Sequence, residues 1–226
     1  GTWWVVHIFD DYADYKVSAF YRGLDNVNIN NAIITISKVN STLTVSNITF
    51  DYGGEGFAAV NFTNASGVVA EVIGQPDAVV GVNDTTITVS GLNAGTYILS
   101  VTTITDENYN NITKNVTVTV NKLKTQLTAK AVTTTYNVNN NLVITLKDAN
   151  GKALSDAKVT VKLKGTKTYT TDKNGQVKIN VAKLVPKTYT AKVTFAGNTN
   201  YLKSTADVKV TVKKTKAKIK AKKKTY

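Results

Sequence analysis

The fold of this chain is decided by the stretch TYTAKVTFAGNTNY (residues 188–201) together with DVKVTV (residues 207–212). Apolar and polar residues alternate in both, and a segment rich in Gly and Asn separates them, which is typical of two strands joined by a loop. The pattern occurs twice more, as TYILSV (96–101) with NVTVTV (115–120) and as DYKV (14–17) with IITI (33–36). Repetition at a fixed period indicates a tandem array of similar domains.

The spacing of the copies predicts the domain boundaries. Tyr97 and Tyr189 lie 92 residues apart, as do Val116 and Val208, and Tyr15 precedes Tyr97 by 82 residues. This is the length of one small β domain. We therefore expect four segments: the C-terminal strands of a truncated repeat at 1–38, complete sandwiches at 39–121 and 122–214, and the start of a further repeat at 215–226. We also expect the sequence to be part of a longer array.

Local patterns within the repeats predict an all-β chain of tandem immunoglobulin-like antiparallel β-sandwiches with almost no helix. Short strands recur between turns rich in Gly, Asn and Asp, and no segment shows a helical period. Residues 148–151 and 172–175 each end in Asn-Gly and are predicted to form hairpin turns. The expected core of the second sandwich is Val159, Val161, Leu163, Ile179, Val193, Phe195, Val210 and Val212.

Charge is divided unevenly along the chain. The net charge is +13, but residues 1–121 carry −7 and residues 122–226 carry +20, the latter from 24 lysines and 4 aspartates. Such asymmetry predicts different surfaces on successive domains. Alternating lysines favour a polyanion-binding face formed by Lys158, Lys162, Lys164, Lys209 and Lys213. The alternative is a solvated face that keeps strand edges soluble. Nucleic acid is a poor partner, because residues 122–226 lack arginine.

Two further motifs suggest structural and modification sites. Leu92-x-x-Gly95-Thr96-Tyr97 and Leu184-x-x-Lys187-Thr188-Tyr189 resemble tyrosine corners, in which the tyrosine hydroxyl bonds to upstream backbone. Seven Asn-x-Ser/Thr sequons are candidates for N-glycosylation if the protein is exported, although a chain rich in Asn and Thr also produces them by chance. They begin at Asn40, Asn47, Asn61, Asn64, Asn83, Asn111 and Asn115.

The sequence disfavours catalysis, and we assign no catalytic, cofactor-binding or metal-binding residue. Cysteine is absent and His7 is the single histidine. A carboxylate pair would have to come from Asp51, Glu55, Glu71 or Asp77, which no motif brings together. A Lys–Asn amide cross-link in the second sandwich would need a buried carboxylic acid from Asp148, Asp156, Asp172 or Asp207. The first three lie in or near expected turns, which argues against burial. No apolar run is long enough to span a membrane.

Residues 148–161 (DANGKALSDAKVTV) and 171–177 (TDKNGQV) resemble the bacterial and archaeal Ig-like repeats of invasin-type adhesins. The whole tandem pattern resembles the adhesin-like Ig-repeat surface proteins of methanogenic archaea. This resemblance implies an extracellular stalk on the cell surface, with its signal and anchor outside this sequence. Its implied partners are neighbouring repeats of the same chain and host-cell or cell-wall glycans. The alternative is a carbohydrate- or polyanion-binding sandwich that uses the lysine-rich face of residues 122–226, or Trp3 and Trp4.

Overall fold

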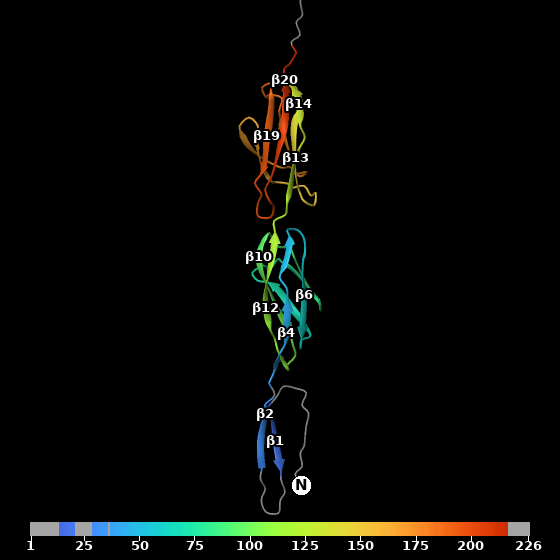
Figure 1. The fold of residues 1–226 in the computed structure, drawn as a ribbon, viewed down its shortest axis with the longest axis vertical. Coiled ribbons are helices and arrows are strands. Elements are labelled where there is room, and N and C mark those ends of the chain that lie inside the picture. The colour runs from blue at the N-terminus through green and yellow to red at the C-terminus, as the bar shows by residue number, and fades with distance from the viewer. Residues whose placement is uncertain (1–13, 21–28, 36, 217–226) are drawn as a thin grey trace, which may run out of the picture. The chain divides into compact units, whose positions relative to one another are not determined.

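The computed structural model describes residues 14–20, 29–35 and 37–216, with side chains described from residue 37 onward. Trp3, Trp4 and His7 therefore lie outside the described residues, as does most of the predicted final segment. The described residues form strands and contain no helix, which confirms the all-β, immunoglobulin-like fold class (Figure 1). The chain divides into two compact units, 1–120 and 121–226, and each is described by itself below.

The repeated stretch forms the same strand pair three times. Strand β1 (Asp14–Phe20) pairs antiparallel with β2 (Ile29–Thr35), and Tyr15 stands opposite Ile34. In the second copy Tyr97 stands opposite Val118, and in the third Tyr189 stands opposite Val210. All three copies therefore have the same register. In the second and third copies a one-residue slip would turn the apolar residues away from the core.

Residues 42–121 form a sandwich of two four-stranded sheets, and all of them except Asn121 belong to unit 1. One sheet has the order β4 (Thr42–Val45), β6 (Gly56–Thr63), β9 (Thr86–Ser90) and β8 (Val79–Val82). The other has the order β5 (Ile48–Asp51), β12 (Thr113–Asn121), β10 (Gly95–Ile104) and β7 (Gly67–Val72). A short parallel pair joins β3 (Val39–Asn40) to β11 (Tyr109–Asn110). Residues such as Ile87, Leu99 and Val118 fill the core between the sheets.

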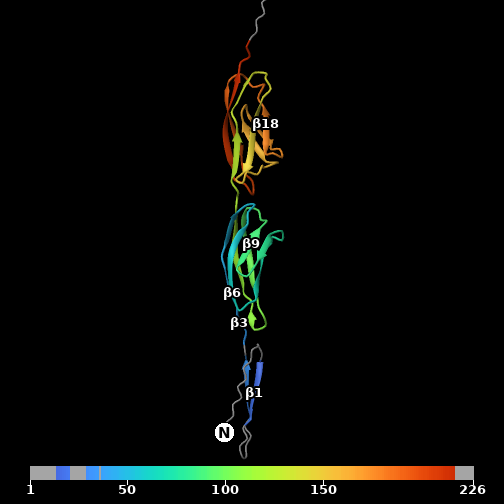
Figure 2. The same cartoon turned by 90° about the vertical axis from the view of Figure 1, so that its right-hand side faces the viewer.

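Unit 2 is a sandwich of a three-stranded and a five-stranded sheet (Figure 2). The smaller sheet has the order β13 (Thr125–Ala129), β15 (Asn141–Asp148) and β18 (Gln176–Asn180). The larger has the order β14 (Val132–Thr135), β20 (Ser204–Lys213), β19 (Thr188–Phe195), β16 (Lys158–Lys162) and β17 (Thr166–Thr170). The predicted core residues all contribute: six are buried, while Leu163 and Ile179 are half-buried and pack against the others.

The hairpin predicted at residues 172–175 is wrong, although the turn itself is present. Residues 172–175 do form a tight turn, in which the Gly175 amide donates to the Asp172 carbonyl (2.8 Å). However, this turn connects β17 to β18, and these strands belong to opposite sheets. The turn at 148–151 is followed only by a single bridge between Lys147 and Ala153. Asn-Gly favours a tight turn but does not specify which sheet the next strand joins.

Candidate anion-binding surface

The outer face of the five-stranded sheet carries four of the five predicted lysines. Val159 and Val161 are buried on β16, so Lys158 and Lys162 point outward from the same strand. Val208, Val210 and Val212 are buried on β20, so Lys209 and Lys213 point outward as well. All four lysines are exposed. The alternation of buried valine and exposed lysine results from the two-residue period of a strand.

Strand register places a further lysine on this face. Lys192 of β19 stands opposite Lys162 on one side and Asp207 of β20 on the other. Two like charges on neighbouring strands repel each other, which an opposite charge or a bound anion would relieve. Sequence reasoning missed Lys192, because the alignment of β16 with β19 is a tertiary pairing. We call Lys158, Lys162, Lys192, Lys209 and Lys213 the lysine face.

Threonines fill the space between these lysines. Thr160 shares a hydroxyl–hydroxyl hydrogen bond with Thr168 of β17 (3.1 Å), and Thr188 shares one with Thr211 (3.5 Å). These hydroxyls can donate or accept, whereas the ammonium groups only donate. The face therefore presents positive charge and hydroxyl groups together, which suits extended anionic chains more than apolar partners.

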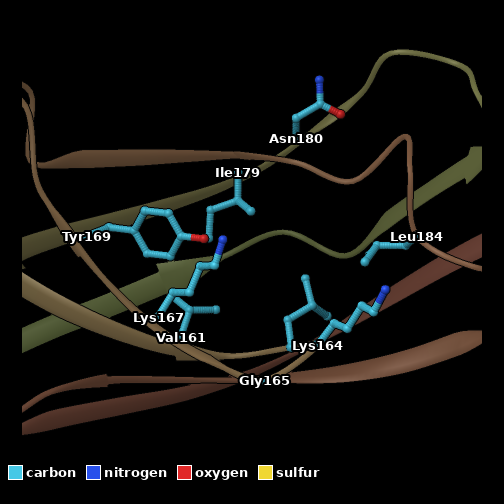
Figure 3. Close-up of a pocket in the computed structure, with 9 residues that line it drawn as sticks. Val161, Lys164, Gly165, Lys167, Tyr169, Ile179, Asn180 and Leu184 are labelled. Carbon is cyan, nitrogen blue, oxygen red and sulfur yellow. The ribbon is translucent and has the colours of Figure 1, made fainter.

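Lys164 does not lie on the lysine face. It belongs to the loop between β16 and β17, where it lines a cavity of about 190 Å³ together with Lys167 and Tyr169. The cavity also contacts Val161, Leu163, Ile179 and Leu184, so its floor is aliphatic and its rim is charged. Figure 3 shows the Tyr169 hydroxyl pointing toward Ile179, with the side chains of Lys164 and Lys167 among those that line the cavity.

The cavity arises from the way the two sheets end. Strand β17 is the last strand of the five-stranded sheet, and β18 is the last strand of the three-stranded sheet. In register, Val159 stands opposite Tyr169 and Val161 opposite Lys167, so Tyr169 and Lys167 point to the inner side of the sheet. Lys167 is nevertheless exposed, because the sandwich is open at this edge. The short polar sequence TKTYT gave no sign of this arrangement.

Both predicted tyrosine-corner residues have backbone hydrogen bonds. The Tyr97 hydroxyl donates to the Asn93 carbonyl (2.9 Å), and the Tyr189 hydroxyl donates to the Val185 carbonyl (2.8 Å). In each case the acceptor lies four residues upstream and the ring packs against the core. These contacts fix the connection that enters β10 or β19, and they occupy the hydroxyl groups that a ligand would otherwise need.

All seven sequon asparagines are exposed. Some also make local hydrogen bonds: the Asn83 side-chain oxygen accepts from the Thr86 amide (2.7 Å), and that of Asn47 accepts from the Thr117 amide (2.9 Å). Exposure makes their amide nitrogens accessible, which N-glycosylation requires. The seven sites are Asn40, Asn47, Asn61, Asn64, Asn83, Asn111 and Asn115.

Asp148 corrects one expectation about the acidic residues. It lies in a turn, as expected, but it is buried, with 5% of its surface exposed. Its carboxylate accepts hydrogen bonds from the amides of Asn150 (3.0 Å) and Lys152 (2.9 Å), so it stabilises the turn at 148–151. Asp172 acts in the same way, accepting from the Gln176 (2.9 Å) and Asn174 (2.8 Å) amides. The hydrogen bond from the Gln176 amide is the main cause that lowers the pKa of the Asp172 carboxyl below its usual value.

The carboxylates considered for catalysis are dispersed over unit 1. Asp51 ends β5 and Glu55 lies in the following turn, whereas Glu71 is on β7 and Asp77 follows it in a loop. Within the described ranges, no group of three or more His, Cys, Asp or Glu residues could hold a metal ion. Over those same residues, no helix has the length and apolar character needed to cross a membrane.

Comparison with known proteins identifies similar folds at low sequence identity. No protein-family model and no curated protein matches the sequence. Among solved structures, titin domains Z1Z2 in complex with telethonin are 13% identical, cover 80% of this chain and 100% of that chain, and give a TM-score of 0.43. Sidekick-1 immunoglobulin domains 1–5 are also 13% identical, over 90% of this chain and 46% of that chain, with a TM-score of 0.40.

The Escherichia coli adhesin FdeC is 14% identical, over 88% of this chain and 74% of that chain, with a TM-score of 0.31. Similarity at this level of identity concerns the fold and indicates neither a ligand nor a partner.

Proposed function

We propose that this chain is a non-catalytic structural and adhesive module, part of the stalk of an archaeal cell-surface adhesin-like protein with invasin-type Ig-like repeats. Its location is extracellular, and its neighbours are further repeats of the same chain. Host-cell or cell-wall glycans are the external partners. The predicted boundaries at 38, 121 and 214 are those of successive repeats in this proposal.

The observation that carries the proposal is the shortness of the connection into unit 2. Strand β12 ends at Asn121, and Leu123 is already part of unit 2. The Leu123 amide donates to the Asn200 carbonyl (2.9 Å), and its carbonyl accepts from the Leu202 amide (2.9 Å). Only Lys122 lies between β12 and these bonds, and its ammonium donates to the Asn198 carbonyl (2.7 Å). A connection this short leaves few rotatable backbone bonds between the two sandwiches, so the proposal expects limited bending, the property that a stalk requires.

Double electron–electron resonance, which measures the distance between two spin labels on the protein, tests this function. The chain contains no cysteine, so Lys114→Cys in unit 1 and Lys178→Cys in unit 2 provide two unique exposed labels. We expect a narrow distance distribution that broadens when Gly-Gly-Ser is inserted after Lys122. The same insertion after Asn150, in a turn within unit 2, serves as the control and should leave the width unchanged. A distribution that is already broad before insertion would overturn the stalk proposal.

The lysine face supports a second candidate function, binding of polyanions. Five exposed lysines share one outer face, and their attraction for an anionic chain should fall as salt screens it. We expect dextran sulfate, an anionic chain without carboxylates, to bind at low salt and to dissociate at high salt, and the variant K162Q/K192Q/K209Q to bind more weakly. The control variant K130Q/K147Q/K178Q removes the same charge from exposed lysines that lie outside this face. Equal weakening by both variants would show a general charge effect and sink the assignment.

A further inference from the structure

The cavity between β17 and β18 combines features that the lysine face does not have. Val161, Leu163, Ile179 and Leu184, which are buried or half-buried, form an aliphatic floor, and the exposed side chains of Lys164 and Lys167 also line the cavity. Within the described residues, no hydrogen-bond or ion-pair partner is found for either ammonium group or for the Tyr169 hydroxyl. A half-buried tyrosine hydroxyl usually finds a partner. Tyr97 and Tyr189 do so on the backbone, whereas the Tyr169 hydroxyl remains available to a ligand.

We propose that this cavity binds one carboxylate-bearing sugar ring, a uronate residue of an acidic glycan. One face of a pyranose ring is made of C–H groups, and these match the aliphatic floor. The carboxylate on the ring would accept charge-assisted hydrogen bonds from Lys164 and Lys167. The ring hydroxyls would meet the Tyr169 hydroxyl, which can donate or accept.

The size of the cavity restricts the ligand to a single ring. Its volume of about 190 Å³ is below the ~300 Å³ at which sites for drug-sized ligands begin. The cavity opens to solvent at the sandwich edge, because β17 and β18 are both last strands of their sheets. The remainder of a glycan chain can therefore continue into solvent on either side of the bound ring.

This site is distinct from the lysine face. Lys167 stands opposite Val161 on the inner side of the sheet, whereas Lys162 points outward. Residues on the two sides of a strand alternate, so the cavity and the lysine face lie on opposite sides of β16 and β17. The proposal also does not depend on the stalk function, since it uses residues of unit 2 alone.

Calorimetric titration of the whole chain with trigalacturonate tests the proposal, with galactotriose as the neutral probe. We expect trigalacturonate to bind and galactotriose to bind at least about tenfold more weakly, since the neutral sugar lacks the carboxylate that the lysines recognise. The variant K164Q/K167Q should lose about tenfold or more in affinity for trigalacturonate, and Tyr169→Phe a smaller, several-fold amount. The matched control K192Q/K209Q removes the same charge from the lysine face and should change the affinity by less than about twofold.

Three results would overturn the assignment. The first is equal loss in K164Q/K167Q and K192Q/K209Q, which would indicate diffuse attraction to the whole basic unit. The second is equal affinity for the acidic and neutral trisaccharides, or none for either. The third is hexaglutamate binding as tightly as trigalacturonate with the same loss in K164Q/K167Q, which would assign the cavity to acidic peptides. If the distance distribution is broad but trigalacturonate binds as expected, the stalk function is overturned and the uronate site in the cavity is retained.

Discussion

The two sandwiches differ most in a single strand, the one that follows β7 in unit 1 and β16 in unit 2. In unit 1 this strand, β8, pairs with β9. In unit 2 it is β17, which turns back and pairs with β16. The two strands therefore extend opposite sheets of otherwise similar sandwiches. As a result β18 is the last strand of its sheet in unit 2, whereas its counterpart β9 in unit 1 lies between β6 and β8.

The connection before the strand explains the difference. In unit 2 the loop has three residues, 163–165, closed by a hydrogen bond from the Leu163 amide to the Gly165 carbonyl (3.1 Å). Gly165 has a φ of +84°, as short hairpins with a left-handed residue require. In unit 1 residues 73–78 separate the strands and include Pro76, which cannot donate a backbone hydrogen bond. The length of the connection thus decides which sheet the strand joins.

The cores also fill equivalent positions differently. Two residues after the corner tyrosine, unit 1 has Leu99 and unit 2 has Ala191, and both are fully buried. Further along the strand, unit 1 buries Thr103, whose hydroxyl shares a hydrogen bond with that of Ser41 (2.8 Å), where unit 2 buries Phe195. The same pattern of burial is therefore compatible with different side-chain volumes, provided that the neighbouring strands compensate.

The largest effect expected from this comparison is that of Leu99→Ala. Removing a fully buried leucine side chain should destabilise unit 1 by about 2–5 kcal/mol, because the surrounding core closes the cavity only in part. Differential scanning calorimetry should show the transition of unit 1 moving to lower temperature while that of unit 2 stays in place. One transition that moves as a whole would show that the units do not unfold independently.

Alanine at the left-handed glycines tests the two connections. Gly165 (φ +84°) and Gly74 (φ +71°) have no atom within 4 Å of an added Cβ, so each substitution costs only backbone strain, about 1–2 kcal/mol. Hydrogen exchange should show lost protection in β17 for Gly165→Ala. Gly67→Ala is the matched control, since Gly67 lacks a positive φ and its Cβ would meet only the Ile104 Cδ1 at 4.0 Å. A control as destabilising as the other two would refute the strain argument.

Phenylalanine at the tyrosine corners should produce a smaller and similar effect in both units. Tyr97→Phe and Tyr189→Phe each remove one hydrogen bond to a backbone carbonyl and should cost about 0.5–1.5 kcal/mol in denaturant unfolding. In unit 2 the Lys187 ammonium also lies 4.8 Å from the centre of the Tyr189 ring. Lys187→Ala should therefore lower the free energy of unfolding of unit 2 by about 0.5–1 kcal/mol. Tyr169→Phe should leave stability unchanged, and a comparable loss there would contradict the free hydroxyl of the cavity.

The smallest expected effect concerns the turn that leads from β17 to β18. Because the folded state lowers the pKa of Asp172 below 3.8, its ionised form stabilises unit 2 above that pH. This contribution disappears as the pH falls through the lowered pKa. We therefore expect Asp172→Asn to destabilise unit 2 slightly at pH 7, and the difference from the wild type to shrink as the pH falls below 3.8. A difference that does not change with pH would assign the effect to turn geometry instead of charge.

Sequence patterns predicted most of the sandwich but little of its edges. The alternation around Val159 and Val161 identified the core strands, because burial on one face repeats every second residue. Strands β5, β14 and β17 were not predicted: β14 and β17 have few apolar residues, whereas β5 alternates apolar and polar residues but is only four residues long. For the candidate sites, the sequence placed Lys158 and Lys209 on one face but missed Lys192, and it grouped with them Lys164, which lies in a loop and lines the cavity.

The sequence by itself determined the repeat, its register and the residues that face the core, since these depend on period and local alternation. Tyr15, Tyr97 and Tyr189 stand opposite Ile34, Val118 and Val210 in three successive strand pairs. Only the tertiary structure decided where the edge strands go, and with them the cavity beside Tyr169. The reason is that pairing at an edge depends on the length of a connection and on which neighbouring strand is within reach, and no residue pattern within the strand records either.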